Sequence, residues 1–203
     1  MVTIDAYDFA NRTAYYSLQI FHPSDSATLY SAGGQAFTNL NGVYKITSAQ
    51  FKLYKFASPT GNAYARLYAI AGTYGTDAVP TGSALATSDP LDVSTITASW
   101  TPTYTLVFSG AQQYEMQPNI KYAIVFENPA SGTIDETNYP GIGYDATTPE
   151  HSGNIITYRN SAWGYSAALD MVFLVTGDLV STTKPSSGNI TSLMTPLIVT
   201  GII

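Results

Sequence analysis

Short segments that alternate apolar and polar residues recur along the chain, and this two-residue period is the feature that most limits its fold. The segments are rich in Val, Ile, Thr, Tyr and Phe, and Gly, Pro, Asn or Asp residues bound them. This pattern is typical of β-strands. We expect strands at residues 15–21, 48–56, 63–70, 99–109, 121–128, 154–160 and 168–177. Because helical patterns are nearly absent, the sequence predicts an all-β protein.

The segment AYARLYAI, residues 63–70, shows the period clearly. One face carries Ala63, Ala65, Leu67 and Ala69, and the other carries Tyr64, Arg66, Tyr68 and Ile70. The turn SPTG at 58–61 is expected to join this strand to the preceding one as an antiparallel hairpin. Residues 72–89 hold too many Gly, Pro and Asp residues for a central strand, so we expect a long crossover between two sheets there. Residues 129–154 are the second long connection that we expect.

Length and composition exclude several classes of protein. A chain of 203 residues is ordinary for one β-sandwich domain. With 14 acidic and 8 basic residues and a net charge of −6, it would repel a phosphate backbone, so we expect no nucleic-acid partner. Without cysteine, disulfides and thiolate zinc sites are excluded. No apolar run approaches the roughly 20 residues that span a bilayer, and no secretory signal is visible at the start.

The composition changes after Asp178, where a Ser/Thr-rich linker leads to an apolar end. We therefore divide the chain into a sandwich at 1–178 and a linker with a tail at 179–203. The tail pairs either with its own sheet or with a neighbouring subunit, because an exposed apolar tail would promote aggregation. The side chains expected to make such contacts are Leu193, Met194, Leu197, Ile198, Val199, Ile202 and Ile203.

Three stretches carry a resemblance to known domains: ITSAQFKLYKFASPTGNAYARLYAIAGTYGTDAVPTGSALATSDPLDVSTI, KYAIVFEN and GYDATTPEHSGN with SAWGYSAALDMVFLVTGD. Together they resemble a loose group of jelly-roll β-sandwich domains similar to carbohydrate-binding modules. Such domains recur in surface proteins of bacteria and archaea and in structural proteins of their viruses. The resemblance covers about residues 30–178. It implies a jelly-roll (Greek-key) sandwich of two antiparallel sheets but fixes no activity.

Titratable side chains are dense only around residues 135–151. Asp135 and Glu136 point apart in an extended chain, so they make a poor pair of glycosidase carboxylates. Asp145, His151 and Ser152 include the residue types of a hydrolase triad, but His and Ser next to each other seldom align for proton transfer. We therefore expect no catalytic residues.

Hard oxygen ligands are the only metal ligands that the chain offers in number, and they favour calcium over zinc. Domains of the resembling group often hold a structural Ca²⁺. Candidate ligands are Asp170, Asp145 and Asp92, although the sequence favours an ordinary capping or turn role for each of them. No cofactor is required by this interpretation.

Aromatic side chains are the remaining binding candidates, because a sugar ring stacks its C–H face on an aromatic ring. We expect Trp163, Tyr165, Tyr139 and Tyr144 to form such a platform, with Asp145, Asn154 and Arg159 donating to or accepting from sugar hydroxyls. The alternative for each aromatic ring is a place in the core.

Three functions remain open from the sequence. The first is a non-catalytic structural protein of a virion or surface assembly that self-associates or contacts neighbouring structural proteins, with possible glycan contact. The second is a carbohydrate-binding module of a secreted protein. The third, a glycan-active enzyme, lacks a convincing pair of carboxylates. We predict the first, located in a virion or at an extracellular surface.

Overall fold

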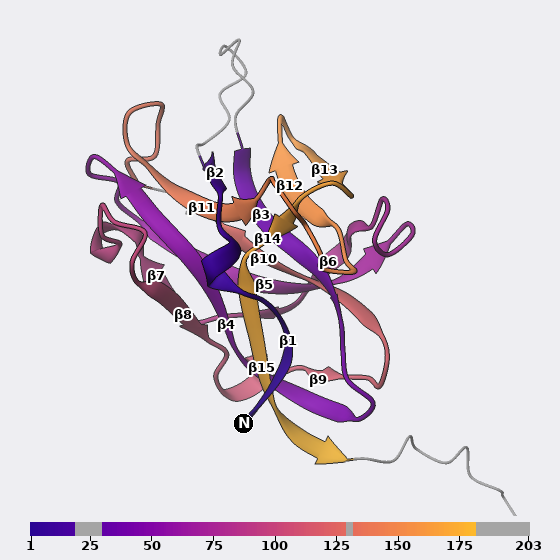
Figure 1. Cartoon of the computed structure of the whole chain (residues 1–203). Helices are drawn as coiled ribbons and strands as arrows, with labels where there is room; N and C mark the ends of the chain where they lie inside the picture. Colours follow the sequence, from indigo (N-terminus) through magenta and orange to yellow (C-terminus); the bar gives the residue numbers. More distant parts are fainter. Residues whose placement is uncertain (19–29, 129–131, 182–203) are drawn as a thin grey trace, which may run out of the picture.

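The computed structural model describes residues 1–18, 30–128 and 132–181, and its elements are almost all β-strands (Figure 1). Three single turns of 3₁₀ helix are the helical segments in these ranges: η1 (Phe9–Asn11), η2 (Val93–Thr95) and η3 (Gly110–Gln112). Within the same ranges no helix has the length and apolar character needed to cross a membrane.

The first sheet is built around β4, the longest strand. Along its length β4 pairs with β15 and then with β11, and it also pairs with β8 and β9. The members of this sheet are β1 (Val2–Tyr7), β2 (Ala14–Ser17), β4 (Val43–Phe56), β8 (Thr103–Val107), β9 (Glu115–Met116), β11 (Tyr139–Asp145), β14 (Asp170–Met171) and β15 (Phe173–Ser181).

The second sheet has the strand order β13-β12-β3-β10-β5-β6, and the short β7 pairs with β5. Every pairing is antiparallel in both sheets. Its members are β3 (Tyr30–Thr38), β5 (Asn62–Ala71), β6 (Val79–Thr87), β7 (Leu91–Asp92), β10 (Lys121–Glu127), β12 (Ile155–Arg159) and β13 (Ala162–Ser166).

The main core lies between the two sheets, as the alternation of the sequence requires. Phe37 and Phe126 of the second sheet meet Phe51 and Phe173 of the first, and all four side chains are fully buried. Ala63, Ala65 and Leu67 of β5 point into this core, whereas Tyr64 and Arg66 point out. The prediction of an all-β sandwich of two antiparallel sheets is confirmed. The jelly-roll connectivity stays a prediction.

A second apolar cluster lies on the other face of the second sheet, where solvent would be expected. Its side chains are alanine, β-branched or aromatic: Ala32, Ala36, Tyr68, Ala78, Ala123, Val125 and Ile156, with Tyr158 and Trp163 packed against them. The rings of Tyr68 on β5 and Trp163 on β13 are 5.9 Å apart, although β12, β3 and β10 lie between these strands in the sheet. β13 also contacts β6. The sheet is therefore curled so that its two outer strands approach each other around this cluster.

Two predicted connections are wrong. The SPTG turn at 58–61 does not close a hairpin, because β4 and β5 belong to different sheets. Residues 72–89 are not an irregular crossover, because they contain β6, which forms the hairpin with β5. The stretch 129–154 likewise contains β11. At the predicted domain boundary, β15 continues past Asp178 to Ser181.

Candidate functional site

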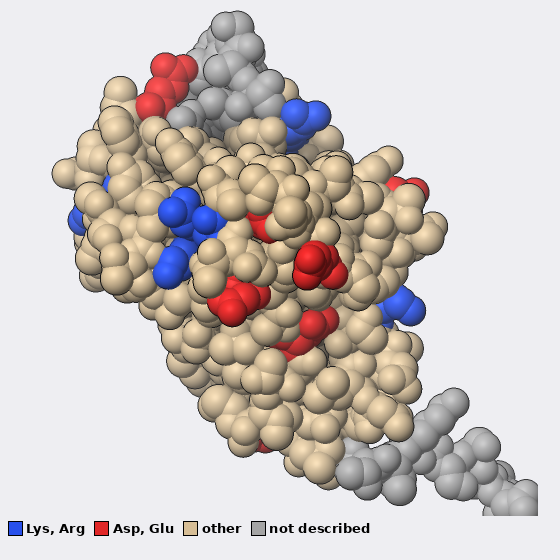
Figure 2. All heavy atoms as spheres, viewed as in Figure 1, with Lys and Arg blue, Asp and Glu red and all other residues tan. Residues whose placement is uncertain are grey.

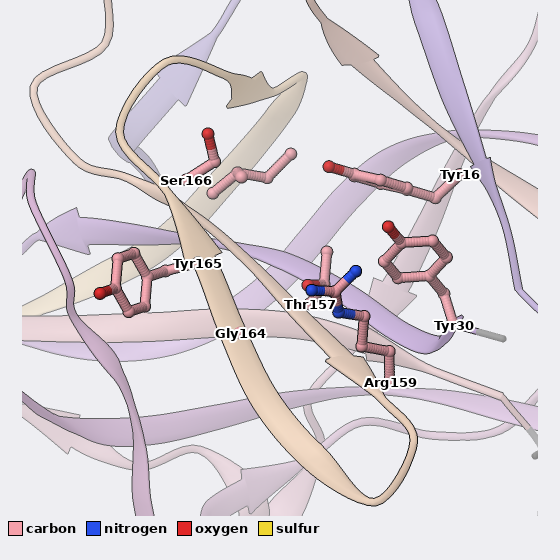
Figure 3. Close-up of a pocket in the computed structure, with 8 residues that line it drawn as sticks. Tyr16, Tyr30, Thr157, Arg159, Gly164, Tyr165 and Ser166 are labelled. Carbon is pink, nitrogen blue, oxygen red and sulfur yellow. The ribbon is translucent and has the colours of Figure 1, made fainter. Parts of the chain in front are cut away.

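A pocket of about 290 Å³ opens at one edge of the sandwich, where β12 and β13 of the second sheet face β2 of the first (Figure 3). Its lining consists of Tyr16, Tyr30, Ile155, Thr157, Arg159, Gly164, Tyr165 and Ser166. The volume is at the small end for ligand pockets and suits about one sugar ring.

The alternation of β12 supplies one wall of the pocket. Ile155, Thr157 and Arg159 are two residues apart, so their side chains share the face that looks toward the first sheet. Thr157 lies directly across from Gly164 of β13. A Cβ atom at residue 164 would be 3.4 Å from Thr157 Oγ1, so the missing side chain of Gly164 leaves this hydroxyl open to the pocket. Thr157 is only 6% exposed, and its hydroxyl makes no hydrogen bond to any described residue.

Two tyrosines form a second wall, with Tyr16 on β2 of the first sheet and Tyr30 on β3, directly across from Arg159 in the β12–β3 pair. The Tyr16 and Tyr30 rings are 4.6 Å apart, and the other neighbour of Tyr16 is Tyr144, whose ring stacks on it at 4.4 Å and 21°. Burial raises the pKa of the Tyr16 hydroxyl, and the nearby Tyr144 and Tyr30 hydroxyls raise it further. The Tyr16 hydroxyl is therefore protonated and able to donate a hydrogen bond at any ordinary pH.

Arg159 is the charged group of the pocket. Its guanidinium carbon is 5.9 Å from the centre of the Tyr30 ring. The ion pairs formed within the described residues do not include Arg159. Figure 3 shows its side chain on the same side of the β12–β13 ribbon as Tyr16, Tyr30 and Thr157. A cation without a carboxylate partner in the described lining is thus turned toward the cavity.

The predicted sugar-binding residues are only partly brought together. Arg159 and Tyr165 line the pocket, although the Tyr165 ring points away from the tyrosine wall and is 55% exposed. Tyr144 lies behind Tyr16. The remaining four residues lie elsewhere. Trp163 packs between Tyr68 and Tyr158, Tyr139 stacks on Phe56, Asn154 is buried with its amide donating to Ala78 O, and Asp145 is buried beside Tyr7.

Asp145 is the centre of a buried network near the start of the chain. Its carboxylate accepts hydrogen bonds from the hydroxyls of Tyr7, Thr13 and Thr147 and from the Thr147 backbone N–H. Burial by itself would raise the pKa of Asp145, but these hydrogen bonds outweigh it and lower the pKa to about 2. The carboxylate is therefore ionised and fully occupied by protein donors.

Asp170 and His151 form a second part of this network. Asp170 lies opposite Asp145 in the β11–β14 pair and accepts hydrogen bonds from Gln35 Nε2 and the His151 backbone N–H. Burial raises the pKa of Asp170 against these bonds. The His151 ring accepts the Gly153 N–H at Nδ1, so its proton is on Nε2, 3.2 Å from Asp5 Oδ1. His151 thereby ties β1 to the loop before β12.

The hydrolase triad is not assembled, because the Ser152 hydroxyl bonds to the Tyr74 hydroxyl rather than to His151. Nor do the three candidate calcium ligands come together. Asp92 caps η2 by accepting the Ser94 N–H, away from the adjacent pair Asp145 and Asp170. Throughout the described ranges, no group of three or more His, Asp or Glu side chains is arranged to hold a metal ion.

The acidic residues Asp135 and Glu136 have a local role at most. The Asp135 carboxylate accepts hydrogen bonds from Thr137 and Asn138 within its own turn. The seven tail side chains predicted to mediate subunit contacts, from Leu193 to Ile203, lie outside the described residues.

Sequence reasoning missed Tyr16, Tyr30, Thr157 and Ser166. The alternation within residues 155–159 could have placed Thr157 beside Arg159, but nothing local links Tyr16 to β12. No protein-family model matches the chain, and no curated protein matches it. The interpretation of the site therefore depends on its geometry.

Proposed function

We propose that the chain is a non-catalytic structural domain of a virion or extracellular surface assembly, and that it contacts glycans through the pocket between β2, β12 and β13. The observation that carries the glycan part is the chemistry of the lining. Three tyrosines, of which Tyr165 turns its ring away, line a cavity of about 290 Å³ together with two small hydroxyl side chains and one guanidinium. Carbohydrate sites combine these elements, since rings contact the C–H face of a sugar and donors bind its hydroxyls.

The absence of acidic side chains from the described lining supports a binding role over hydrolysis. Glycoside hydrolysis ordinarily requires two carboxyl groups on either side of the scissile bond. The buried carboxylates Asp145 and Asp170 are both bonded to protein donors. A carbohydrate-binding module of a secreted protein is the alternative function, and it would use the same pocket.

The assembly part draws on the end of β15. Leu179 and Val180 are 50% and 47% exposed just before the Ser/Thr-rich linker that leads to the apolar end of the chain. Figure 2 shows a surface with few charged side chains, which suits a protein that packs against neighbours rather than repelling them.

Two measurements test the proposal separately. For the glycan part, ¹⁵N and tyrosine ¹³C spectra of the full chain would be recorded while panels of neutral and acidic oligosaccharides are added, and shifts at Tyr16, Tyr30 and Arg159 are expected. Shifts confined to other residues, or none, would contradict a pocket for sugars. For the assembly part, light scattering would compare the full chain with one ending at Ser181. Oligomers are expected only for the full chain, and two monomers would contradict assembly through the tail.

A further inference from the structure

Arg159 is the charged group of the described lining, and the other polar groups there are hydroxyls, which both donate and accept. Arg159 has five N–H groups and no acceptor. Tyr16 holds its proton, and the Thr157 hydroxyl is open to the cavity with no partner among the described residues. Ser166 Oγ accepts the Ala168 N–H, so its own proton is free to be donated toward the cavity. A neutral sugar can pair with the hydroxyls of the lining, because hydroxyls both donate and accept, but it offers Arg159 no charged partner.

We propose that the pocket binds the carboxylate of an acidic sugar unit, with Arg159 as the partner of that carboxylate and the Tyr16–Tyr30 wall against the sugar ring. This inference rests on the proposed glycan contact and names its ligand class. A guanidinium is planar and pairs with a carboxylate through two parallel hydrogen bonds. The guanidinium carbon of Arg159 is 5.9 Å from the centre of the Tyr30 ring, so the charge and the tyrosine wall adjoin each other.

The shape of the pocket favours a sugar acid over a free inorganic anion. Sulfate or phosphate could pair with Arg159 but would leave the tyrosine wall without a contact. Because residue 164 is a glycine, a ligand can reach the Thr157 hydroxyl, which is buried between the strands. A small anion that binds only to Arg159 would not use this access. Ring contact and charge pairing therefore act on the same ligand at the same time.

Figure 3 also explains why Tyr165 is not part of the proposed contact. Its ring lies on the other side of β13 from Arg159 and Tyr16, so a ligand on the tyrosine wall does not reach it. Ile156, the residue across from Tyr165, likewise belongs to the second apolar cluster and not to the pocket.

The test uses two ligands that differ only in the charged group, methyl β-D-glucuronide and methyl β-D-glucoside. Each is titrated into the full chain, with binding followed by calorimetry and by tyrosine ¹³C shifts. The glucuronide is expected to bind about tenfold tighter or more, and to shift Tyr16 and Tyr30. Arg159→Gln should remove the preference. Lys45→Gln removes a charge elsewhere, from a surface pair with Glu115, and should leave the preference unchanged.

A second variant blocks the cavity without touching the charge. Gly164→Val fills the space in front of Thr157 and is expected to weaken binding of the glucuronide at least about tenfold, and its urea midpoint shows whether the fold is kept. Inorganic sulfate is the competing ligand. Equal affinity for the two glycosides would overturn the inference but keep a glycan pocket. Sulfate binding with no glucuronide binding, or no binding of either glycoside, would overturn both.

Discussion

The ring of Trp163 on β13 meets the ring of Tyr68 on β5 edge to face, at 5.9 Å and 66°, across the interior of the curled second sheet. Tyr158 of the neighbouring strand contacts the same indole at 4.8 Å. The indole thus connects two strands that three others separate in the hydrogen-bonded order.

Replacing Trp163 should open this curl. Trp163→Ala is expected to lower the free energy of unfolding by about 2 to 4 kcal/mol, since it removes a large, partly buried ring and its aromatic pairs. Urea unfolding followed by circular dichroism measures it. Tyr165→Ala on the same strand removes an exposed ring and should cost less than about 1 kcal/mol. Equal losses for the two variants would show that the indole does not hold the sheet edges together.

The network at Asp145 makes a prediction about acid stability. The pKa of Asp145 is lowered to about 2 in the folded protein, so the ionised carboxylate stabilises the fold. This contribution is fully present above the ordinary pKa of an aspartate, and it is lost as the pH falls through about 2. Asp145→Asn should lower the free energy of unfolding at neutral pH by about 2 to 3 kcal/mol, since one oxygen no longer accepts. The substitution should also reduce the change of the free energy of unfolding with pH between about pH 4 and about pH 2.

Urea midpoints at several pH values check this. Tyr7→Phe serves as the graded comparison, because it deletes one of the donors and should cost about 1 kcal/mol. Asp170 has the opposite effect on the acid profile. Because burial raises its pKa, its contribution to the stability of the fold declines as the pH rises. An unchanged acid profile in Asp145→Asn would mean that other carboxylates control the transition.

Tyr68 makes the corresponding prediction at alkaline pH. Burial and, next in size, the hydrogen bond that Tyr68 donates to Glu127 together raise the pKa of Tyr68 to about 12. A raised pKa favours the neutral form in the folded state, so stability should fall as the pH rises from about 10 to about 12. Tyrosine ¹³C titration of Glu127→Gln should show an earlier Tyr68 transition. No change would indicate that burial alone sets the pKa.

Substitution by alanine is expected to change the stability of the fold very differently at two glycines, Gly34 and Gly164. A Cβ at Gly34 would lie 2.1 Å from the Ile124 backbone oxygen on the paired strand β10, which cannot move aside. Gly34→Ala should therefore destabilise the fold by about 3 kcal/mol or more. Gly164→Ala meets only the Thr157 hydroxyl at 3.4 Å and should change stability by less than about 1 kcal/mol. Thermal unfolding of the two variants makes the comparison.

The fold class could be predicted because alternation is a local property, but the connections could not. Pro59 and Gly61 favour a turn whether the chain stays in one sheet or crosses to the other. β6 escaped notice because it holds Pro80 and Gly82. As the outermost strand it tolerates a proline opposite Ile70, and the left-handed Gly82, at φ 68°, lies where the pairing register with β5 shifts.

The candidate site was predictable only in part for a related reason. Arg159 could be singled out as a polar residue in a strand-like segment, and its expected role in binding stays a prediction. Trp163 is expected in the platform because an aromatic ring can stack on a sugar. It lies instead on the face of β13 away from the pocket, where it packs against Tyr68 and Tyr158. Tyr30 reaches the pocket through the pairing of β3 with β12, and Tyr16 reaches it through the packing of the first sheet on the second. No local pattern encodes either contact.

The curl of the second sheet also limits how copies of this protein could associate. Its outer strands β13 and β6 contact each other, so neither offers a long straight row of backbone groups to an incoming strand. An added strand would then pair with the first sheet, for example at its outer strand β1, which pairs with β15 on its other side. Polymerisation through sheet edges would accordingly run through the first sheet and would leave β12 and β13, which line the pocket, outside the new junctions.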